Sequence, residues 1–188
     1  MPPNAATIYY FLLVPGTLLV FYPAAYSVQS EVDAGMLETL FGIPDYRYKV
    51  WLARQVVQQI IVALLLSMLA WLCQVALADF AISAMVFHLM FPLLFLGSVG
   101  FMLASTIRNG NGAAAVLVVV VLFAWIFGVE ALQGSRWNLF HNPFEQAESY
   151  VVIVQQATTF HNRVYLLAGS VLATLGGLLR LQRRERFF

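Results

Sequence analysis

Residues 30–47 read SEVDAGMLETLFGIPDYR, a polar and patterned stretch between two long apolar runs. The first run covers about residues 8–28 and the second about 55–77. A helix of about 20 mostly apolar residues crosses the hydrocarbon core of a bilayer, so each run is long enough to span a membrane. We therefore expect residues 29–54 to form a loop at one membrane face.

The composition extends this interpretation to the whole chain of 188 residues. Hydrophobic residues make up 61% of the sequence and charged residues 10%, whereas a soluble domain carries roughly 25% charged residues. Three further apolar runs follow, at about residues 80–106, 112–129 and 163–181. Lipid cannot satisfy backbone hydrogen bonds, and these runs are longer than the strands of a membrane barrel. The sequence predicts one all-α integral membrane domain, residues 1–188, with five transmembrane helices.

The placement of the basic residues predicts the orientation of these helices, because Lys and Arg gather on the cytoplasmic side of membrane proteins. With the N-terminus outside, most of the 10 basic residues face the cytoplasm, and only Arg136 and Arg163 lie outside. The cytoplasmic ones are Arg47, Lys49, Arg54, Arg108, Arg180, Arg183, Arg184 and Arg186. The loop 29–54 is then cytoplasmic, and the mixed segment 130–162 is external.

The cytoplasmic loop has an amphipathic pattern rather than the composition of a linker. Leu37, Leu40 and Phe41 are spaced i, i+3 and i+4, which places them on one face of a helix. Gly42 and Pro44 end helical geometry soon afterwards. Such a short helix has two interpretations: it docks a partner protein, or it lies in the membrane interface.

The same loop resembles the signature of the ABC-2 family of ATP-binding-cassette transporter permeases. In that family a transmembrane helix runs into a pattern of the form S-I-x-x-E-x-x-x-G-T-L-E-x-L-L-x-x-P-x-x-R, and here Met36 replaces the usual Thr. The matching positions are Glu31, Gly35, Leu37, Glu38, Leu40, Pro44 and Arg47. The later Asn142-Pro143-Phe144 also resembles the N-P-F turn that many members carry in the external segment before the last helix.

The resemblance implies a function and a set of partners. In the family the loop is a coupling helix, here residues 36–43 with Phe41 on its docking face, and it fits a groove on a cytoplasmic ATPase subunit. The chain would be a non-catalytic permease subunit of an exporter in the cell inner membrane, with a second permease chain, the same or different, and two ATPase subunits. ATP and Mg would bind to the ATPase, and this chain would bind no cofactor or metal itself.

The chain departs from the family in one respect. Family members usually have six transmembrane helices with the signature between the second and third, whereas here the signature follows the first apolar run. The missing first helix places the N-terminus outside, in agreement with the charge distribution. A second permease chain could supply the missing helix. The alternative function is a membrane scaffold without transport activity that recruits a cytoplasmic partner through the same loop.

The sequence lacks the motifs and residue types that several functions require. No phosphate-binding GxxxxGK[ST] loop occurs, so the chain is not itself the ATPase. None of the five apolar cores contains Asp, Glu, Lys or Arg, whereas ion-driven transporters place such groups near the midplane. A formal net charge of +1 indicates no nucleic-acid partner, and a single cysteine, Cys73, allows no intrachain disulfide. Membrane lipid and protein subunits are therefore the expected contacts.

Polar residues within the apolar runs are expected to join helices. His88 lies in the third run, and an interhelical hydrogen bond is favoured over a haem or quinone ligand because no second buried histidine is predicted. Gln55 and Gln59 are one turn apart in the second run and either line a polar entry or, as we favour, hydrogen-bond to a neighbouring helix.

Small residues and prolines predict close packing. Gly169, Ala173 and Gly177 recur at four-residue spacing, and packing within one chain is favoured over a dimer seam. Prolines and glycines in the first and third runs indicate helices in the bundle interior or near a transport pathway. The external residues 147–159 are amphipathic, and the sequence does not separate a re-entrant helix from one that lies on the membrane surface.

Overall fold

The computed structural model describes residues 3–30, 47–107, 109–132, 134–145 and 152–181. Within these ranges the regular structure is helical throughout: α1 (Ala5–Ala25), a π-helical turn (Arg47–Leu52), α4 (Ala53–Ala76), α5 (Ile82–Ile107), α6 (Gly110–Glu130) and α7 (Val152–Arg180). The candidate spans, counted from Val50 for α4, are long and apolar enough to cross a bilayer. The prediction of an all-α, multi-pass membrane protein with five spanning helices is confirmed for the described part of the chain.

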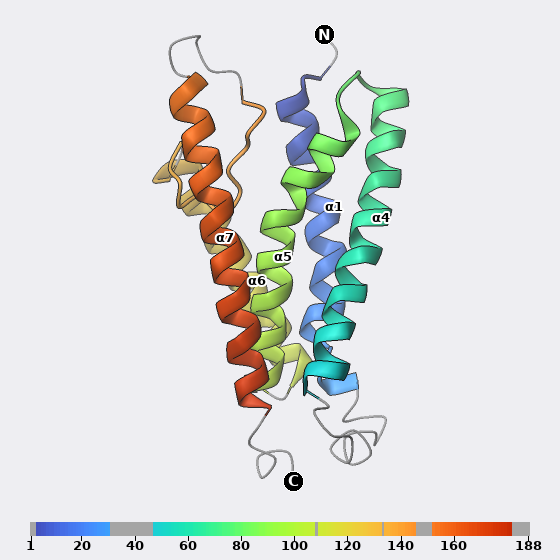
Figure 1. The fold of residues 1–188 in the computed structure, drawn as a ribbon, viewed down its shortest axis with the longest axis vertical. Helices are drawn as coiled ribbons and strands as arrows, with labels where there is room; N and C mark the ends of the chain where they lie inside the picture. Colours follow the sequence, from blue (N-terminus) through green and yellow to red (C-terminus); the bar gives the residue numbers. More distant parts are fainter. Residues whose placement is uncertain (1–2, 31–46, 108, 133, 146–151, 182–188) are drawn as a thin grey trace.

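The helices run up and down between two ends (Figure 1). One end carries the last residues of α1, α5 and α7 and the first residues of α4 and α6, and we call it the loop end because residues 31–46 connect α1 to α4 there. The opposite end, which we call the N-terminal end, carries the start of α1 and the connections after α4 and α6. The residues that flank the predicted coupling loop, Ser30 and Arg47, thus lie at the same end of the bundle as the end of α7.

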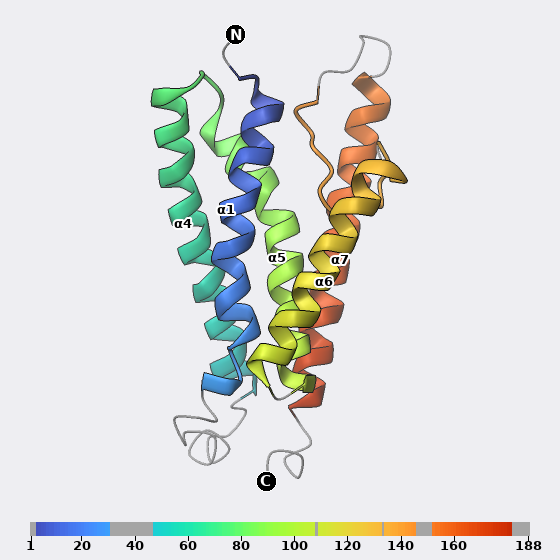
Figure 2. The same cartoon turned by 180° about the vertical axis from the view of Figure 1, so that it is seen from behind.

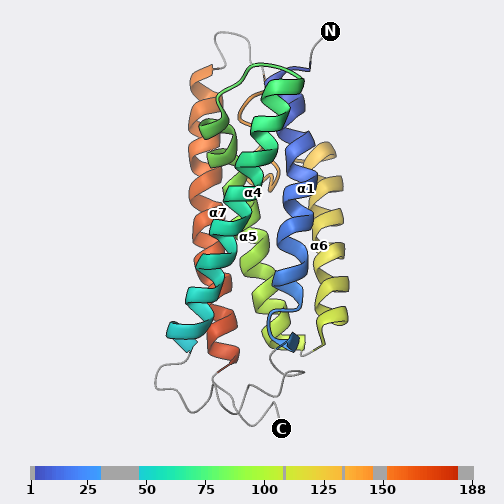
Figure 3. The same ribbon diagram turned by 90° about the vertical axis from the view of Figure 1, so that its right-hand side faces the viewer.

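α5 is the central helix and contacts each of the other four (Figures 1 and 3). Of the residues in the most apolar 18-residue stretch of α5, 50% are buried inside the bundle, which is a larger share than in the other four spans. Pro92 lies inside this helix, and Leu89, Leu93 and Leu96 are buried around it. The expected interior position of the third apolar run is therefore confirmed.

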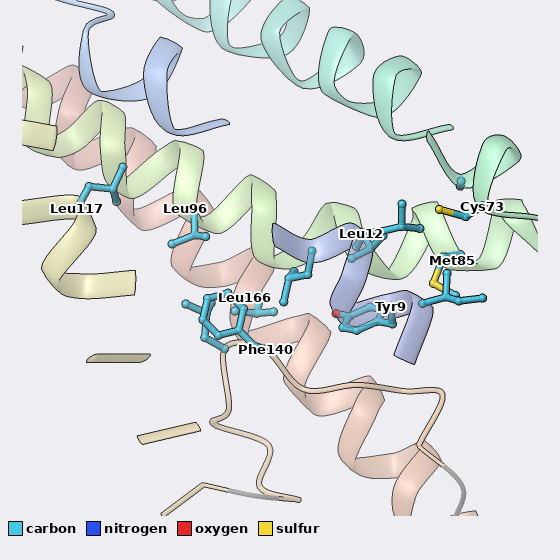
Figure 4. Packing of buried hydrophobic residues seen from close by; sticks show 13 residues of the cluster. Tyr9, Leu12, Cys73, Met85, Leu96, Leu117, Phe140 and Leu166 are labelled. Carbon is cyan, nitrogen blue, oxygen red and sulfur yellow. The ribbon is translucent and has the colours of Figure 1, made fainter. Parts of the chain in front are cut away.

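Buried side chains from all five spanning helices and one connection form the largest core cluster. Leu12 of α1, Met85 and Leu96 of α5 and Leu166 of α7 pack there with Phe140 (Figure 4). In lipid, helix association depends on van der Waals packing rather than on removal of apolar surface from water. The fit of these side chains is therefore the main source of cohesion.

Glycines allow the helices that surround α5 to approach it closely. A Cβ atom added at Gly177 of α7 would lie 2.7 Å from the Phe101 ring, and one added at Gly169 would lie 2.7 Å from the Phe95 ring. Ala173, between them, is buried. The small-residue face of α7 thus packs on α5 of the same chain, as predicted.

Hydrogen bonds fasten the loop end of the bundle. The Tyr26 hydroxyl donates to Asn111 Oδ1 at 2.6 Å, and the Gly110 amide donates to Gln29 Oε1. Arg54 Nη2 donates to Ser30 Oγ at 3.3 Å. The end of α1 is therefore tied to the start of α6 and to the first turn of α4.

α7 begins at Val152, well before residue 163, where the fifth apolar run was expected to begin. Residues 152–159, which the sequence left between a re-entrant and a surface-lying helix, belong to this single long helix. Residues 147–151 lie outside the described ranges.

Candidate functional site

The predicted coupling helix lies outside the described residues. This applies to Glu31, Gly35, Leu37, Glu38, Leu40, Phe41 and Pro44. Arg47 begins the π-helical turn that leads into α4. The Arg54–Ser30 hydrogen bond joins the residues on the two sides of the loop.

The connection after α6 returns into the bundle between α1 and α7 (Figure 2). Two Asn-x-Phe turns shape it, since Asn138 Oδ1 accepts from the Phe140 amide at 3.0 Å and Asn142 Oδ1 accepts from the Phe144 amide at 3.0 Å. Each asparagine donates from its other end to a helix carbonyl. Asn138 Nδ2 bonds to Gly128 O of α6, and Asn142 Nδ2 bonds to Ala6 O of α1. The predicted N-P-F residues Asn142, Pro143 and Phe144 therefore form a turn that is anchored to the first helix.

Asn162 and Arg163 of α7 complete a buried group that we call the polar cluster: Asn138, His141, Asn142, Asn162 and Arg163. Asn162 Nδ2 donates to the carbonyls of Asn138 at 2.8 Å and Arg136 at 2.9 Å. Arg163 Nη1 donates to Asn162 Oδ1 at 3.0 Å, and Arg163 Nη2 donates to His141 O at 3.2 Å. A buried carbonyl without a partner is costly, so these bonds hold the irregular segment inside the bundle.

Tyr9 of α1 also bonds to the segment, because its hydroxyl donates to His141 O at 3.3 Å. The His141 imidazole is within hydrogen-bonding distance of α7, with 2.9 Å between Nε2 and Thr159 Oγ1. Burial lowers the pKa of His141 from its ordinary value of 6.5 to about 4, and Arg163 and His88 act in the same direction. The folded protein therefore keeps His141 neutral at physiological pH.

This pKa predicts that acid weakens the fold. Above pH 6.5 His141 is neutral in both the folded and the unfolded chain; as the pH falls toward 4, only the unfolded chain takes up the proton, so stability is lost. We expect a loss of roughly 1 kcal/mol between pH 7 and pH 5.5. Denaturant unfolding in detergent at several pH values measures it. The His141→Gln variant should lose this part of the pH dependence; an unchanged slope would contradict the assignment.

A charged side chain is unusual at a buried position such as that of Arg163. Its side chain is 5% exposed, and within the described residues no carboxylate pairs with it. Its Nε has no hydrogen-bond partner in the part of the chain that the structure describes, and its guanidinium carbon lies 5.5 Å from the centre of the Phe91 ring. The expectation that Arg163 is an external, topology-setting residue missed this burial. The sequence feature that could have indicated this burial is the polar pair Asn162-Arg163 inside a long amphipathic helix.

A groove opens beside Arg163 between α5 and α7, and we call it the α5/α7 groove. Its volume is about 530 Å³. Its lining comprises Phe87, His88, Phe91, Pro143, Val152, Gln155, Gln156, Thr159, Phe160, Arg163, Val164 and Leu167. One cation and several neutral polar groups therefore share a groove with aromatic and aliphatic side chains.

A second groove, the α4/α7 groove, lies toward the loop end and has a volume of about 600 Å³. Its walls are apolar except for a few side chains that include Gln55, Gln59, Ser98 and Thr174. The interhelical hydrogen bonds favoured for the two glutamines are not formed within the described residues: Nε2 of both is buried without a partner. Gln59 instead packs against Gly97, where an added Cβ would lie 2.7 Å from its Nε2.

The hydrogen bond favoured for His88 is also not formed by its Nδ1, which is buried without a partner in the described part of the chain. Phe87 and Phe144 hold the ring by edge-to-face contacts, with centroid distances of 5.4 Å and 5.6 Å. The two rings contact His88 beside the α5/α7 groove, so packing contributes to its orientation. Among the described residues no group of three potential His, Cys, Asp or Glu ligands could hold a metal ion.

Comparisons with protein-family models, with curated proteins and with solved structures gave no match for this chain. The five candidate membrane-spanning helices make this chain a multi-pass membrane protein. An irregular segment, residues 134–145, lies within the helical bundle at the N-terminal end of the bundle.

Proposed function

We propose that this chain is the transmembrane permease subunit of an ATP-driven ABC-2-type exporter of the cell inner membrane. The observation that carries the proposal is the signature in residues 31–47, where Glu31, Gly35, Glu38 and Arg47 stand at the family's positions. It lies in the sequence between two spanning helices, and its flanking residues are at the bundle end where α7 also ends, which supports a docking role.

Movement of the loop would reach the bundle through the contacts at its two sides. Ser30 bonds to Arg54 of α4, and Tyr26 and Gln29 bond to the start of α6. α1 and α4 both pack on α5, which also contacts α7. A push from an ATPase on the coupling helix would therefore displace α1 and α4 together against the central helix. ATP and Mg would remain on the ATPase.

A second permease chain would cover the α4/α7 groove. The buried amide nitrogens of Gln55 and Gln59 have no partner among the described residues. Unpaired polar groups in an apolar environment are costly, so a neighbouring helix with a hydrogen-bond acceptor would stabilise this face.

The proposal predicts a nucleotide-binding partner whose activity depends on the loop. We expect the full-length chain, purified from its native membrane, to bring with it a subunit that has a Walker A motif and hydrolyses ATP. Glu38→Ala and Arg47→Ala should each lower the ATPase activity recovered with the chain by about tenfold or more, because each would remove one side of a charged contact. Partner identity by mass spectrometry and phosphate release measure the two effects.

Two substitutions in the same loop provide matched controls. Asp33→Ala and Lys49→Ala remove charges of the same sign outside the signature positions and should retain the activity. A co-purified partner without a nucleotide site would favour the scaffold alternative. Full activity in both signature variants would exclude the docking role.

A further inference from the structure

Arg163 retains binding capacity that its neighbours do not use. A guanidinium has five N–H groups, and the described residues accept from Nη1 and Nη2 once each. Both acceptors, Asn162 Oδ1 and His141 O, are neutral, and the buried Nε has no partner among the residues that the structure describes. A buried cation with neutral neighbours pays most of its desolvation cost without compensation. An anion in contact with this guanidinium would remove that cost.

The position of Arg163 along α7 corresponds to the headgroup region rather than the bilayer centre. From Arg163 to the last residue of α7, Arg180, the helix rises by about 25 Å at 1.5 Å per residue. This distance is close to the hydrocarbon thickness of about 30 Å, so a helix that crosses the bilayer places Arg163 near the opposite boundary of the core. Lipid phosphates lie just beyond that boundary.

The α5/α7 groove has a polar part and an apolar part, as the binding of an amphiphile requires. Toward the start of α7 it offers the polar side chains of Gln155, Gln156 and Thr159, and toward the bundle centre it offers Val164 and Leu167. Phe87 and Phe160, at its sides, are 60% and 67% exposed. Since these exposed rings belong to spanning helices, the groove opens toward lipid.

We propose that the α5/α7 groove binds one anionic phospholipid from the leaflet at the N-terminal end, with the lipid phosphate on Arg163 and an acyl chain along Val164 and Leu167. The phosphate accepts from the N–H groups that the protein leaves open, in the charge-assisted geometry that guanidinium and phosphate prefer. The apolar wall distinguishes a phospholipid from free phosphate, which would gain nothing from it. This binding does not depend on the proposed transport function.

The test uses the full-length protein, delipidated in a neutral detergent and titrated with dioleoyl-phosphatidylglycerol or dioleoyl-phosphatidylcholine. Native mass spectrometry counts the bound lipids. We expect one phosphatidylglycerol to bind about tenfold more tightly than phosphatidylcholine, and Arg163→Gln to abolish that preference. Equal affinities for the two lipids would overturn the proposal. Displacement of phosphatidylglycerol by millimolar inorganic phosphate would identify a site for free anions and overturn the lipid assignment.

Substitutions at Gln156 test the site without touching the polar cluster, in case Arg163→Gln does not fold. Gln156 is exposed, lines the groove and makes no hydrogen bond among the described residues. Gln156→Glu should weaken phosphatidylglycerol binding and Gln156→Lys should strengthen it, each by about fivefold, because one charge at a membrane surface has about this effect. Ala157→Glu adds the same charge on the same turn outside the groove and should change the affinity less than Gln156→Glu. Equal effects of Gln156→Glu and Ala157→Glu would overturn the proposal.

Discussion

Asn162→Leu should destabilise the protein by about 3 kcal/mol or more. The side chain is 1% exposed and makes three hydrogen bonds, to Arg136 O, Asn138 O and Arg163. Leucine has nearly the same size but no polar atoms, so the Arg136 carbonyl and one guanidinium N–H lose their partner inside the bundle, and the Asn138 carbonyl keeps only the bond from the His141 amide. Each buried group left without a hydrogen bond costs about 1–3 kcal/mol.

Thermal or denaturant unfolding of the purified protein in detergent measures this loss. Gln156→Leu is the matched control, since it removes an exposed amide on the same helix that makes no hydrogen bond within the described residues. The control should unfold near the wild-type midpoint. If both variants unfold at the same midpoint, the polar cluster does not hold the segment after α6 in place.

Gly100→Ala should destabilise the protein by about 2 kcal/mol or more, because overpacking of a tight contact has costs of this size. An added Cβ at Gly100 would lie 2.6 Å from the Cβ of Ala24 and 3.1 Å from a Leu117 methyl. The Ala24 methyl is attached directly to the α1 backbone and cannot rotate away. α1 and α5 would have to separate at this crossing.

Gly176→Ala is the matched control for this substitution. An added Cβ there would lie 3.3 Å from the Met102 sulfur, which belongs to a flexible side chain. Helix propensity favours alanine over glycine by about 1 kcal/mol at both positions, so the difference between the variants reports the contact with Ala24. Equal unfolding midpoints for the two variants would exclude a tight α1–α5 crossing at Gly100.

The helices were predictable because length and hydropathy alone decide whether a segment can cross a bilayer. The five apolar runs coincide with α1, α4, α5, α6 and the later part of α7. Close packing of the Gly169 and Gly177 face within the chain also followed from the sequence, since small residues at four-residue spacing leave a face that a neighbouring helix can approach. Both predictions rest on properties of a single helix.

The roles of individual polar residues were less predictable. His88, Gln55 and Gln59 were expected to form interhelical hydrogen bonds, whereas His88 Nδ1 and both glutamine Nε2 atoms are buried without partners in the described part of the chain. Whether a polar atom meets an acceptor depends on the rotation and depth of two helices relative to one another. One helix's sequence does not contain that information.

By itself the sequence determined that this protein is a bundle of five membrane-spanning helices with a patterned loop between the first two, because apolar length and helical spacing are local properties. Only the tertiary structure decided that residues 134–145 return into the bundle, that Asn162 supports them, and that Arg163 is buried beside an open groove. The physical reason is that each polar-cluster residue depends on partners from other segments. Asn142 meets Ala6 and Arg163 meets His141 only after α1, α5 and α7 have packed together.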